Sequence, residues 1–460
     1  MTRRPALSLT SRDLRPLAAD LRRTGAALAR AYPGESERRQ PVHTVYGGGH
    51  LFRAGTAPKL GAVALAALEE YAPDPETLGQ ALFPDDSRPD AAVLSTLRAR
   101  IVGKLRREPV EDFRIDFEDG YGHRPDEEED GHAVSAAAEV AAGLEAGTLP
   151  PCIGIRVKPF SRELHARSLR TLDLFTTALA AATKRRLPPT FVVTLPKIMA
   201  AAQVAAAARA CAALERRLRL ASGSLTLELM IETPQSIFGP DGRSVLRALV
   251  TAGEGRVTGA HFGTYDYTAL CGITAEWQHM RHQACDFAKH MMQVALAQSG
   301  VHLSDGATTI MPVPPHRGTP DEPLTEALRR DNRAAVHRAW KIHFDDVRHS
   351  LVNGYYQGWD LHPAQLPVRY AAVYAFFLGA LPAATARLRN FVERAAQATL
   401  AGDVFDDAAT GQGLLNFFAR GLGSGAITLD EARETGLTAA ELQGRSFVRI
   451  LENRRKGAPV

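Results

Sequence analysis

The 460-residue sequence is short of several features that would place it at once in a common protein class. No apolar run reaches the roughly 18 residues that a membrane-spanning helix requires, so we expect no membrane association. Cysteine is scarce, and its four positions lack CxxC spacing, which argues against a disulfide framework or a cysteine zinc site and favours a reducing, cytoplasmic location. The formal net charge is only +4, which removes the electrostatic argument for a nucleic-acid partner.

The first 32 residues are rich in arginine and loosely amphipathic. An organellar transit peptide has this character, but Asp13 and Asp20 interrupt it and no secretory apolar region follows. We therefore expect a plain N-terminal helical segment within residues 1–40. At the other end of the chain, residues 371–460 carry helix-like stretches that end at glycines, and we expect a C-terminal helical extension there.

Between these ends, strand-like and helix-like patterns alternate with great regularity. Eight segments read as strands, and they are residues 41–48, 113–119, 152–160, 190–198, 225–233, 257–266, 307–314 and 357–365. Strict alternation implies parallel strands joined by right-handed crossovers, and eight such units close most naturally into an α/β (β/α)8 TIM barrel, here residues 41–370. An open doubly wound sheet is the alternative, but the glycine-rich "YGGGH" lacks its GxGxxG spacing.

Ionisable side chains stand at the predicted C-terminal ends of six of these strands. They are Asp116, Glu118, Asp119, Arg156, Lys158, Lys197, Glu232, His261, Asp266 and His362. Singly, each has an ordinary explanation as a helix cap, an ion pair or a packed histidine. Their concentration where parallel barrels place their active sites favours a functional interpretation.

Two of these carboxylates suggest a metal site. Glu232 and Asp266 end consecutive predicted strands, so their side chains should be neighbours. Adjacent carboxylates repel unless one is protonated or a cation lies between them, and oxygen ligands suit Mg²⁺ or Mn²⁺. A capping role for Glu232 is an equally good interpretation at this point, and Lys197 is expected chiefly as a partner of Glu118 or Asp119.

The ordered motifs "DFEDG", "RVKPF", "TLPKI", "MIETP", "HFGTYDYTALCG" and "WDLHPAQ" resemble the citrate lyase β-subunit-like aldolase/lyase family of the phosphoenolpyruvate/pyruvate-domain superfamily. The resemblance covers about residues 40–370. It implies a Mg²⁺-dependent (or Mn²⁺-dependent) carbon–carbon lyase that acts on a 2-keto acid or a hydroxyacyl-CoA thioester through a metal-stabilised enolate. Related barrels form trimers or hexamers, so it also implies a homo-oligomer.

The resemblance implies roles for individual residues. Glu232 and Asp266 match the metal carboxylates, Arg156 matches the arginine that faces the substrate, and Glu118 and Asp119 match the acidic pair behind it. Three further strand-end residues join Arg156 as candidates for substrate binding, and they are Lys158, Lys197 and His362.

Alternatives remain open. "TYDY" is also similar to the metal-aspartate segment of malate synthases, which condense an acyl-CoA with glyoxylate. A non-catalytic metal-binding barrel fits the same residues, and a phosphoryl-transfer enzyme fits less well because no phosphate cradle is evident. The sequence departs from the family at "VYGGGH", at Lys158 and in a long insertion at residues 316–356, which leaves the substrate and the use of CoA open. The general base has several candidates, and they are His50, His261, His362, Asp406 and Asp407.

Overall fold

A computed structural model describes residues 8–36, 38–393, 399–401, 404–406, 408–443 and 450. Within them, eight parallel strands form a nearly closed barrel, which confirms the predicted (β/α)8 fold. The strands are β1 (His43–Gly48), β2 (Asp112–Asp116), β3 (Cys152–Arg156), β4 (Phe191–Leu195), β5 (Thr226–Ile231), β6 (Val257–Phe262), β7 (His302–Ser304) and β8 (Gly358–Asp360).

From β1 to β7 each strand pairs with the next one in the sequence, and β8 pairs with β1, so the sheet wraps round on itself. Where β7 and β8 meet, the backbone N–H of Asp305 donates to the carbonyl of Gln357 over 2.8 Å, and that of Trp359 donates to Gly306 over 2.9 Å. These bonds draw the last gap together and bring the C-terminal ends of all eight strands to one mouth of the barrel.

The prediction for the seventh strand was wrong. We expected residues 307–314, whereas β7 is His302–Ser304 and only Ala307 of the predicted segment bridges to β8. The predicted segment contains Pro312 and Pro314, and proline has no N–H to donate to a ladder. Six of the other seven predicted segments contain a barrel strand, and the segment 113–119 overlaps β2 from Phe113 to Asp116.

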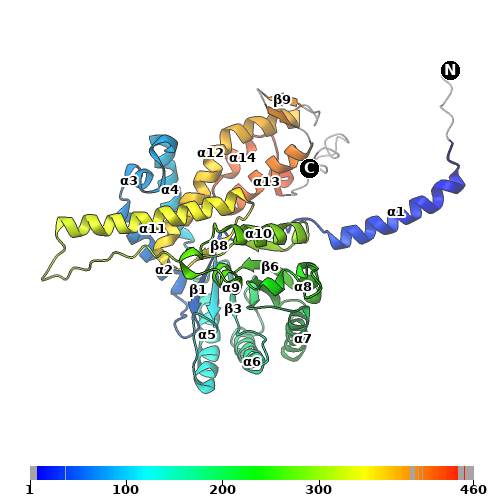
Figure 1. Ribbon diagram of the computed structural model, residues 1–460, viewed down its shortest axis with the longest axis horizontal. Coiled ribbons are helices and arrows are strands. Elements are labelled where there is room, and N and C mark those ends of the chain that lie inside the picture. Colours follow the sequence, from blue (N-terminus) through cyan, green and yellow to red (C-terminus); the bar gives the residue numbers. More distant parts are fainter. Residues whose placement is uncertain are drawn as a thin grey trace.

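Helices connect the strands and cover the outside of the barrel (Figure 1). They are α2 (Thr56–Tyr71), α3 (Pro75–Leu82), η1 (Asp85–Ser87) and α4 (Ala91–Arg107) after β1, α5 (Asp126–Ala146) after β2, α6 (His165–Ala182) after β3, α7 (Ala201–Leu218) after β4, η2 (Pro234–Ser236) and α8 (Leu246–Ala252) after β5, α9 (Thr264–Leu270), η3 (Ala275–Trp277) and α10 (Gln283–Leu296) after β6, and α11 (Glu326–Val352) after β7. The long insertion noted in the sequence is thus largely a crossover helix.

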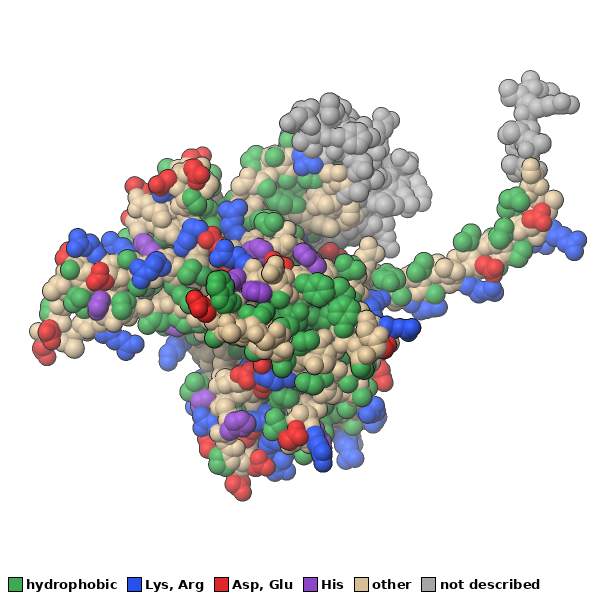
Figure 2. Space-filling model, viewed as in Figure 1, with side chains coloured by type: hydrophobic (Ala, Val, Ile, Leu, Met, Phe, Trp, Pro, Cys, Tyr) green, Lys and Arg blue, Asp and Glu red, His purple; other side chains and the backbone are tan. Residues whose placement is uncertain are grey.

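The N-terminal helix α1 (Ser11–Ala31) has no buried residue and reaches away from the barrel (Figure 1). Its hydrophobic side chains stand clear of the other described elements (Figure 2). Among the described residues, the contacts lie at its C-terminal end and just after it: Arg247 Nη2 donates to the carbonyl of Ala31 over 2.6 Å, and the N–H of Gly34 donates to Gln298 over 3.0 Å.

After β8, the chain continues with helices that pack beside the barrel (Figure 1). The elements are η4 (Pro363–Gln365), α12 (Leu366–Glu393), β9 (Thr399–Ala401), β10 (Val404–Asp406), α13 (Ala408–Ser424), α14 (Leu429–Arg433) and α15 (Ala439–Gln443). The boundary that we expected at residue 370 falls inside α12, because this helix starts on the barrel and continues beyond it. By length and composition, Pro363–Glu393 is long and apolar enough for a membrane span. Leu366, Tyr370 and Phe377 are buried in the core, however, and a core helix is compatible with a soluble protein.

The interior of the barrel contains buried ion pairs. Arg114 of β2 pairs with its neighbour Asp112 and, over 2.6 Å, with Glu228 of β5. Near the join of β8 to β1, Arg369 donates from Nε and Nη2 to Asp360 over 3.0 and 2.9 Å, and Asp360 is fully buried. Buried charges are tolerated when they are paired in this way.

Candidate active site

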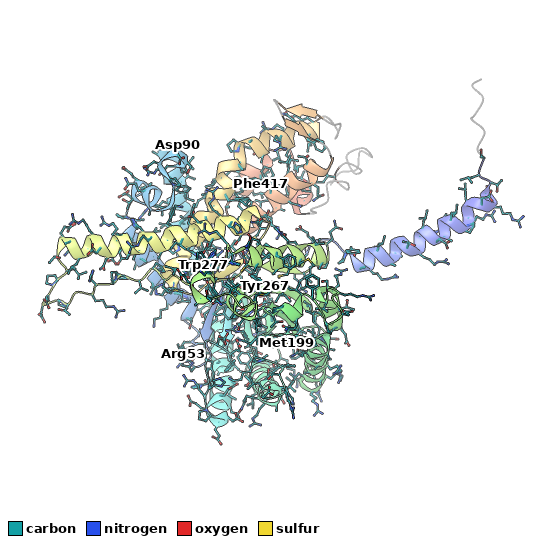
Figure 3. All side chains as sticks on the ribbon, in the orientation of Figure 1. Arg53, Asp90, Met199, Tyr267, Trp277 and Phe417 are labelled. Atoms are coloured by element: carbon teal, nitrogen blue, oxygen red, sulfur yellow. The ribbon has the colours of Figure 1, made fainter. Side chains whose placement is uncertain are left out.

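Seven charged side chains meet at the C-terminal mouth of the barrel, and we call them the mouth cluster. They are Asp116, Glu118, Asp119, Arg156, Lys197, Glu232 and Asp266. They come from the ends of β2, β3, β4, β5 and β6, or from the residues just beyond. Met199 and Tyr267, which closely follow Lys197 and Asp266 in the chain, mark this end of the barrel in Figure 3.

Arg156 is held rigidly at the end of β3. It lies opposite Asp116 in the strand register, and its Nε and Nη2 donate to the two oxygens of Asp116 over 2.7 and 2.5 Å. Its guanidinium carbon also lies 4.8 Å from the ring centroid of Tyr46 and 5.9 Å from that of Trp359. A bidentate carboxylate and two aromatic rings together fix the plane of the guanidinium.

The three residues that contact Arg156 in this way, Asp116, Tyr46 and Trp359, were absent from the catalytic residues predicted from the sequence. Asp116 had been noted only as one carboxylate among several, and it also accepts the N–H groups of Glu118 and Gly120 over 3.0 and 2.7 Å. Tyr46 and Trp359 were not singled out at all. The alternation of β1 and β8 signals that both aromatics point inward, but it does not show that they converge on Arg156.

Glu118 and Asp119 follow β2 and face two cations. Glu118 Oε2 lies 2.9 Å from Arg156 Nη1, and its Oε1 contacts Lys197 Nζ. Burial, together with the neighbouring Asp119, raises the pKa of Glu118 to about 7, although Arg156 and Lys197 act in the opposite direction. Burial also opposes ionisation of Asp119, but Arg156 and Lys197 outweigh it and lower its pKa below the ordinary value.

Glu232 lies directly beyond β5 and is only 2% exposed. Its Oε1 accepts the backbone N–H of Lys197 over 2.6 Å. The cap interpretation of Glu232 does not hold, because Thr233 Oγ1 is the group that caps η2, accepting from Ser236 over 3.1 Å. Burial, and then the charge of Asp266, raises the pKa of Glu232 to about 8.

Gly263 makes room for the Glu232 carboxylate. The last registered pair of β5 and β6 is Ile231 with Phe262, so Glu232 and Gly263 lie side by side beyond it. A Cβ on Gly263 would stand 2.5 Å from both Cβ and Oε2 of Glu232, which is closer than atoms can approach without displacement. Glycine at this position therefore lets the carboxylate lie against the start of α9.

Asp266 lies in the first turn of α9, where a negative charge is favourable, but it does not cap that helix. Its side chain is 39% exposed, and its Oδ2 lies 3.5 Å from Lys197 Nζ. The carboxylate therefore faces the mouth and the other charged groups.

The charges of the mouth cluster do not balance. Five carboxylates face the two cations Arg156 and Lys197, which leaves an excess of three negative charges when all are ionised. Within the part of the chain that the structure describes, no group of three or more His, Cys, Asp or Glu is arranged to hold a metal ion. Mg²⁺, however, commonly takes only one or two protein carboxylates, and the pair of Glu232 and Asp266 fits that requirement.

Two predicted substrate-binding residues lie apart from the mouth cluster. Lys158 is buried, and its Nζ donates to the carbonyl of Phe117 and to Glu129 of α5, each over 2.7 Å. His362 caps η4, with its Nδ1 accepting from Ala364 over 3.1 Å, and burial lowers its pKa. The structure does not bring either side chain to Arg156, because each is held by a local partner instead.

The candidate bases are also dispersed. His261 lies inside the barrel, 3.0 Å from Glu228, and its Nδ1 accepts the indole N–H of Trp359 over 3.2 Å. His50 lies beside the rings of Tyr121 and His132, and burial followed by the nearby Arg124 lowers its pKa.

Of the acids suggested on the C-terminal extension, Asp407 lies outside the described residues and Asp406 belongs to β10. The general base therefore stays unassigned.

Comparisons with known proteins agree with the barrel fold. No curated protein matches the chain. A citrate lyase from Burkholderia xenovorans LB400 has a TM-score of 0.54 at 20% sequence identity, covering 75% of this chain and 93% of that one. A malate synthase from Haloferax volcanii, in a complex with magnesium and glyoxylate, has a TM-score of 0.45 at 14% identity, covering 89% and 98%. At 20% identity, the likeness to the citrate lyase shows a shared fold.

The family comparison covers nearly the whole chain. Residues 21–450 match the model of a family described as a domain of unknown function, DUF6986. This match includes every strand of the barrel and every residue of the mouth cluster. The chain belongs to the DUF6986 family.

Proposed function

We propose that this chain is a Mg²⁺- or Mn²⁺-dependent carbon–carbon lyase that acts on a 2-keto acid or a hydroxyacyl-CoA thioester. The observation that carries the proposal is the position of Glu232, a nearly fully buried carboxylate that faces a second carboxylate, Asp266, at the catalytic end of the barrel. Burial of a carboxylate beside another is costly without a proton or a cation. The fold shared with a citrate lyase supports the reaction class.

The cation would be held by Glu232 and Asp266, with its other positions open to water and substrate. When bound, it would supply a Lewis acid for a carbonyl or carboxylate oxygen of the substrate. The remaining chemistry of binding and orientation belongs to the side chains of the mouth cluster.

Arg156 would bind the substrate oxygen that gains negative charge. Its guanidinium has five N–H donors; Asp116 accepts from two of them and Glu118 lies 2.9 Å from Nη1, so the remaining donors on Nη1 and Nη2 are left for a ligand. Asp116, Tyr46 and Trp359 hold this edge before the substrate arrives, and preorganised donors of this kind stabilise developing charge. Glu118 would act as a positioning residue that keeps Arg156 and Lys197 apart and oriented.

Calorimetric titration of the metal-stripped protein with Mg²⁺ and Mn²⁺ tests the proposal. The titration is made with and without pyruvate, oxaloacetate or glyoxylate, and in parallel on Glu232→Gln. We expect the wild type to bind the metal, a keto acid to tighten that binding, and the variant to lose it.

Wild-type protein that binds neither metal would contradict the proposal and favour a barrel with structural carboxylates. Where binding is found, a screen of hydroxyacyl-CoA thioesters for cleavage, beside an assay of acetyl-CoA with glyoxylate, distinguishes the lyase direction from condensation.

A further inference from the structure

The ammonium group of Lys197 lies among the carboxylates of the mouth cluster. Its Nζ contacts Glu118 Oε1, lies 3.2 Å from Asp119 Oδ2 and lies 3.5 Å from Asp266 Oδ2. A lysine amine is protonated at neutral pH with its ordinary pKa, and each of these three partners is a carboxylate. The lysine therefore carries a positive charge beside Asp266, one of the two carboxylates proposed to hold the metal.

The backbone of Lys197 is engaged separately from its side chain. Its N–H donates to Glu232 over 2.6 Å, and its φ of 50° is the left-handed conformation that non-glycine residues seldom adopt. This conformation follows Pro196, the residue after β4, and it directs the N–H toward Glu232 after β5 while the side chain reaches Glu118 after β2 and Asp266 of α9. A change of the side chain can thus remove the ammonium without removing the bond to Glu232.

We propose that Lys197 is the counter-ion of the metal-free site and that it competes with the divalent cation. The inference rests on the proposed function, since it takes Glu232 and Asp266 as the metal ligands. Two cations that share one carboxylate at short range repel each other, so metal binding requires the ammonium to leave Asp266. Lys197 then sets a lower affinity for the metal than the carboxylates alone would provide.

The Lys197 ammonium has a second carboxylate partner to which it can move. The Lys197 side chain is 29% exposed, so solvent reaches it, and Asp119 is 59% exposed at the rim of the mouth. Movement toward Asp119 would leave Asp266 free while the lysine keeps a carboxylate partner. Displacement of the ammonium from Asp266 therefore does not leave it buried without a charged partner, which would destabilise the protein much more.

Titration calorimetry on the full-length, metal-stripped chain tests the competition with MgCl2 and MnCl2 as the probes. The variants are Lys197→Met and Lys197→Gln, which remove the charge, and Lys197→Arg, which keeps it. Lys341→Met is the matched control, because Lys341 pairs with Asp345 within α11, outside the mouth cluster. We expect both neutral variants to bind each metal about tenfold tighter or more, with little change in Lys197→Arg or Lys341→Met.

The outcomes separate this inference from the proposed function. Tighter binding of each metal by both neutral variants than by the wild type, with Lys197→Arg unchanged, would support the competition. Equal or weaker binding in the neutral variants, with clear binding by the wild type, would overturn the competition and leave the metal site standing. No binding by any variant that retains the wild-type circular dichroism spectrum would overturn both the metal site and the competition.

Discussion

Glu232→Gln should make the metal-free protein more stable while it abolishes metal binding. Glutamine is nearly isosteric with protonated glutamate, and its side-chain oxygen can still accept the N–H of Lys197. Because burial and Asp266 raise the pKa of Glu232 from 4.5 to about 8, the folded wild type must keep a proton there at neutral pH that the unfolded chain releases. Glutamine does not ionise, so the variant has no free-energy penalty for keeping this side chain neutral in the folded state.

The size of the expected stabilisation follows from the pKa shift of Glu232. At pH 7 the group is ionised in the unfolded chain and mostly protonated in the folded one, so the difference of about 2.5 pH units from 4.5 corresponds to about 3 kcal/mol. The entropy of unfolding is ~2.1 cal/mol/K per residue, or about 1 kcal/mol/K for 460 residues, so Tm should rise by about 3 °C.

The sign of the pH dependence is also determined. A raised pKa means that the wild type is not penalised below pH 4.5, loses stability relative to the variant as the pH rises to about 8, and changes no further above that. Thermal unfolding in EDTA at several pH values measures this. Excess Mg²⁺ should reverse the order, because ligand binding stabilises only the wild type.

Glu215→Gln is the control for this experiment. Glu215 pairs with Arg256 over 2.6 Å, and its pKa is lowered despite its burial, so its replacement should destabilise the protein at pH 7. If Glu232→Gln lowers Tm in EDTA, or if its effect does not vary with pH, our account of the Glu232 environment is wrong.

Further predictions concern other parts of the barrel. Arg156→Lys should lower kcat/KM by about 100-fold with little effect on folding, because lysine cannot keep the bidentate contact while it binds substrate; steady-state kinetics on an accepted substrate and circular dichroism check this. Asp360→Asn should cost about 3–5 kcal/mol in urea denaturation, because it leaves Arg369 buried without its charged partner, and a loss below 1 kcal/mol would contradict that role. Gly263→Ala should weaken Mg²⁺ binding about tenfold or more in calorimetry, because the new Cβ displaces the Glu232 carboxylate, and unchanged affinity would show that the carboxylate is not a ligand.

The fold was largely predictable from the sequence, because strand and helix patterns are local. Strand-like and helix-like patterns in regular alternation indicated eight βα units, and a parallel barrel was the natural way to close them. The one misplaced strand shows the limit of this reasoning. β-branched and apolar residues near 307–314 favoured a strand, whereas closure of the barrel selected the short His302–Ser304, which no pattern in the sequence distinguished.

The candidate site was predictable to the level of which strand ends carry charge. In a parallel barrel all C-terminal ends face the same mouth, so the residues just beyond Ile231 and Phe262 had to be neighbours whatever the details of packing. The role of each side chain was less predictable. Arg156 and Lys158 are two positions apart, yet one reaches the mouth and the other pairs with Glu129 on α5.

By itself, then, the sequence determined the order of elements, the barrel and the group of carboxylates at one end, because these depend on periodicity and on a single direction of the strands. Only the tertiary structure decided which charges meet. Glu232 is buried against Gly263, Arg156 is held by Asp116 and two aromatic rings, and Lys197 bridges Glu118, which follows β2, and Asp266 of α9. The physical reason is that a carboxylate's protonation and an ammonium's partner depend on burial and on distances of a few ångströms between segments far apart in the chain.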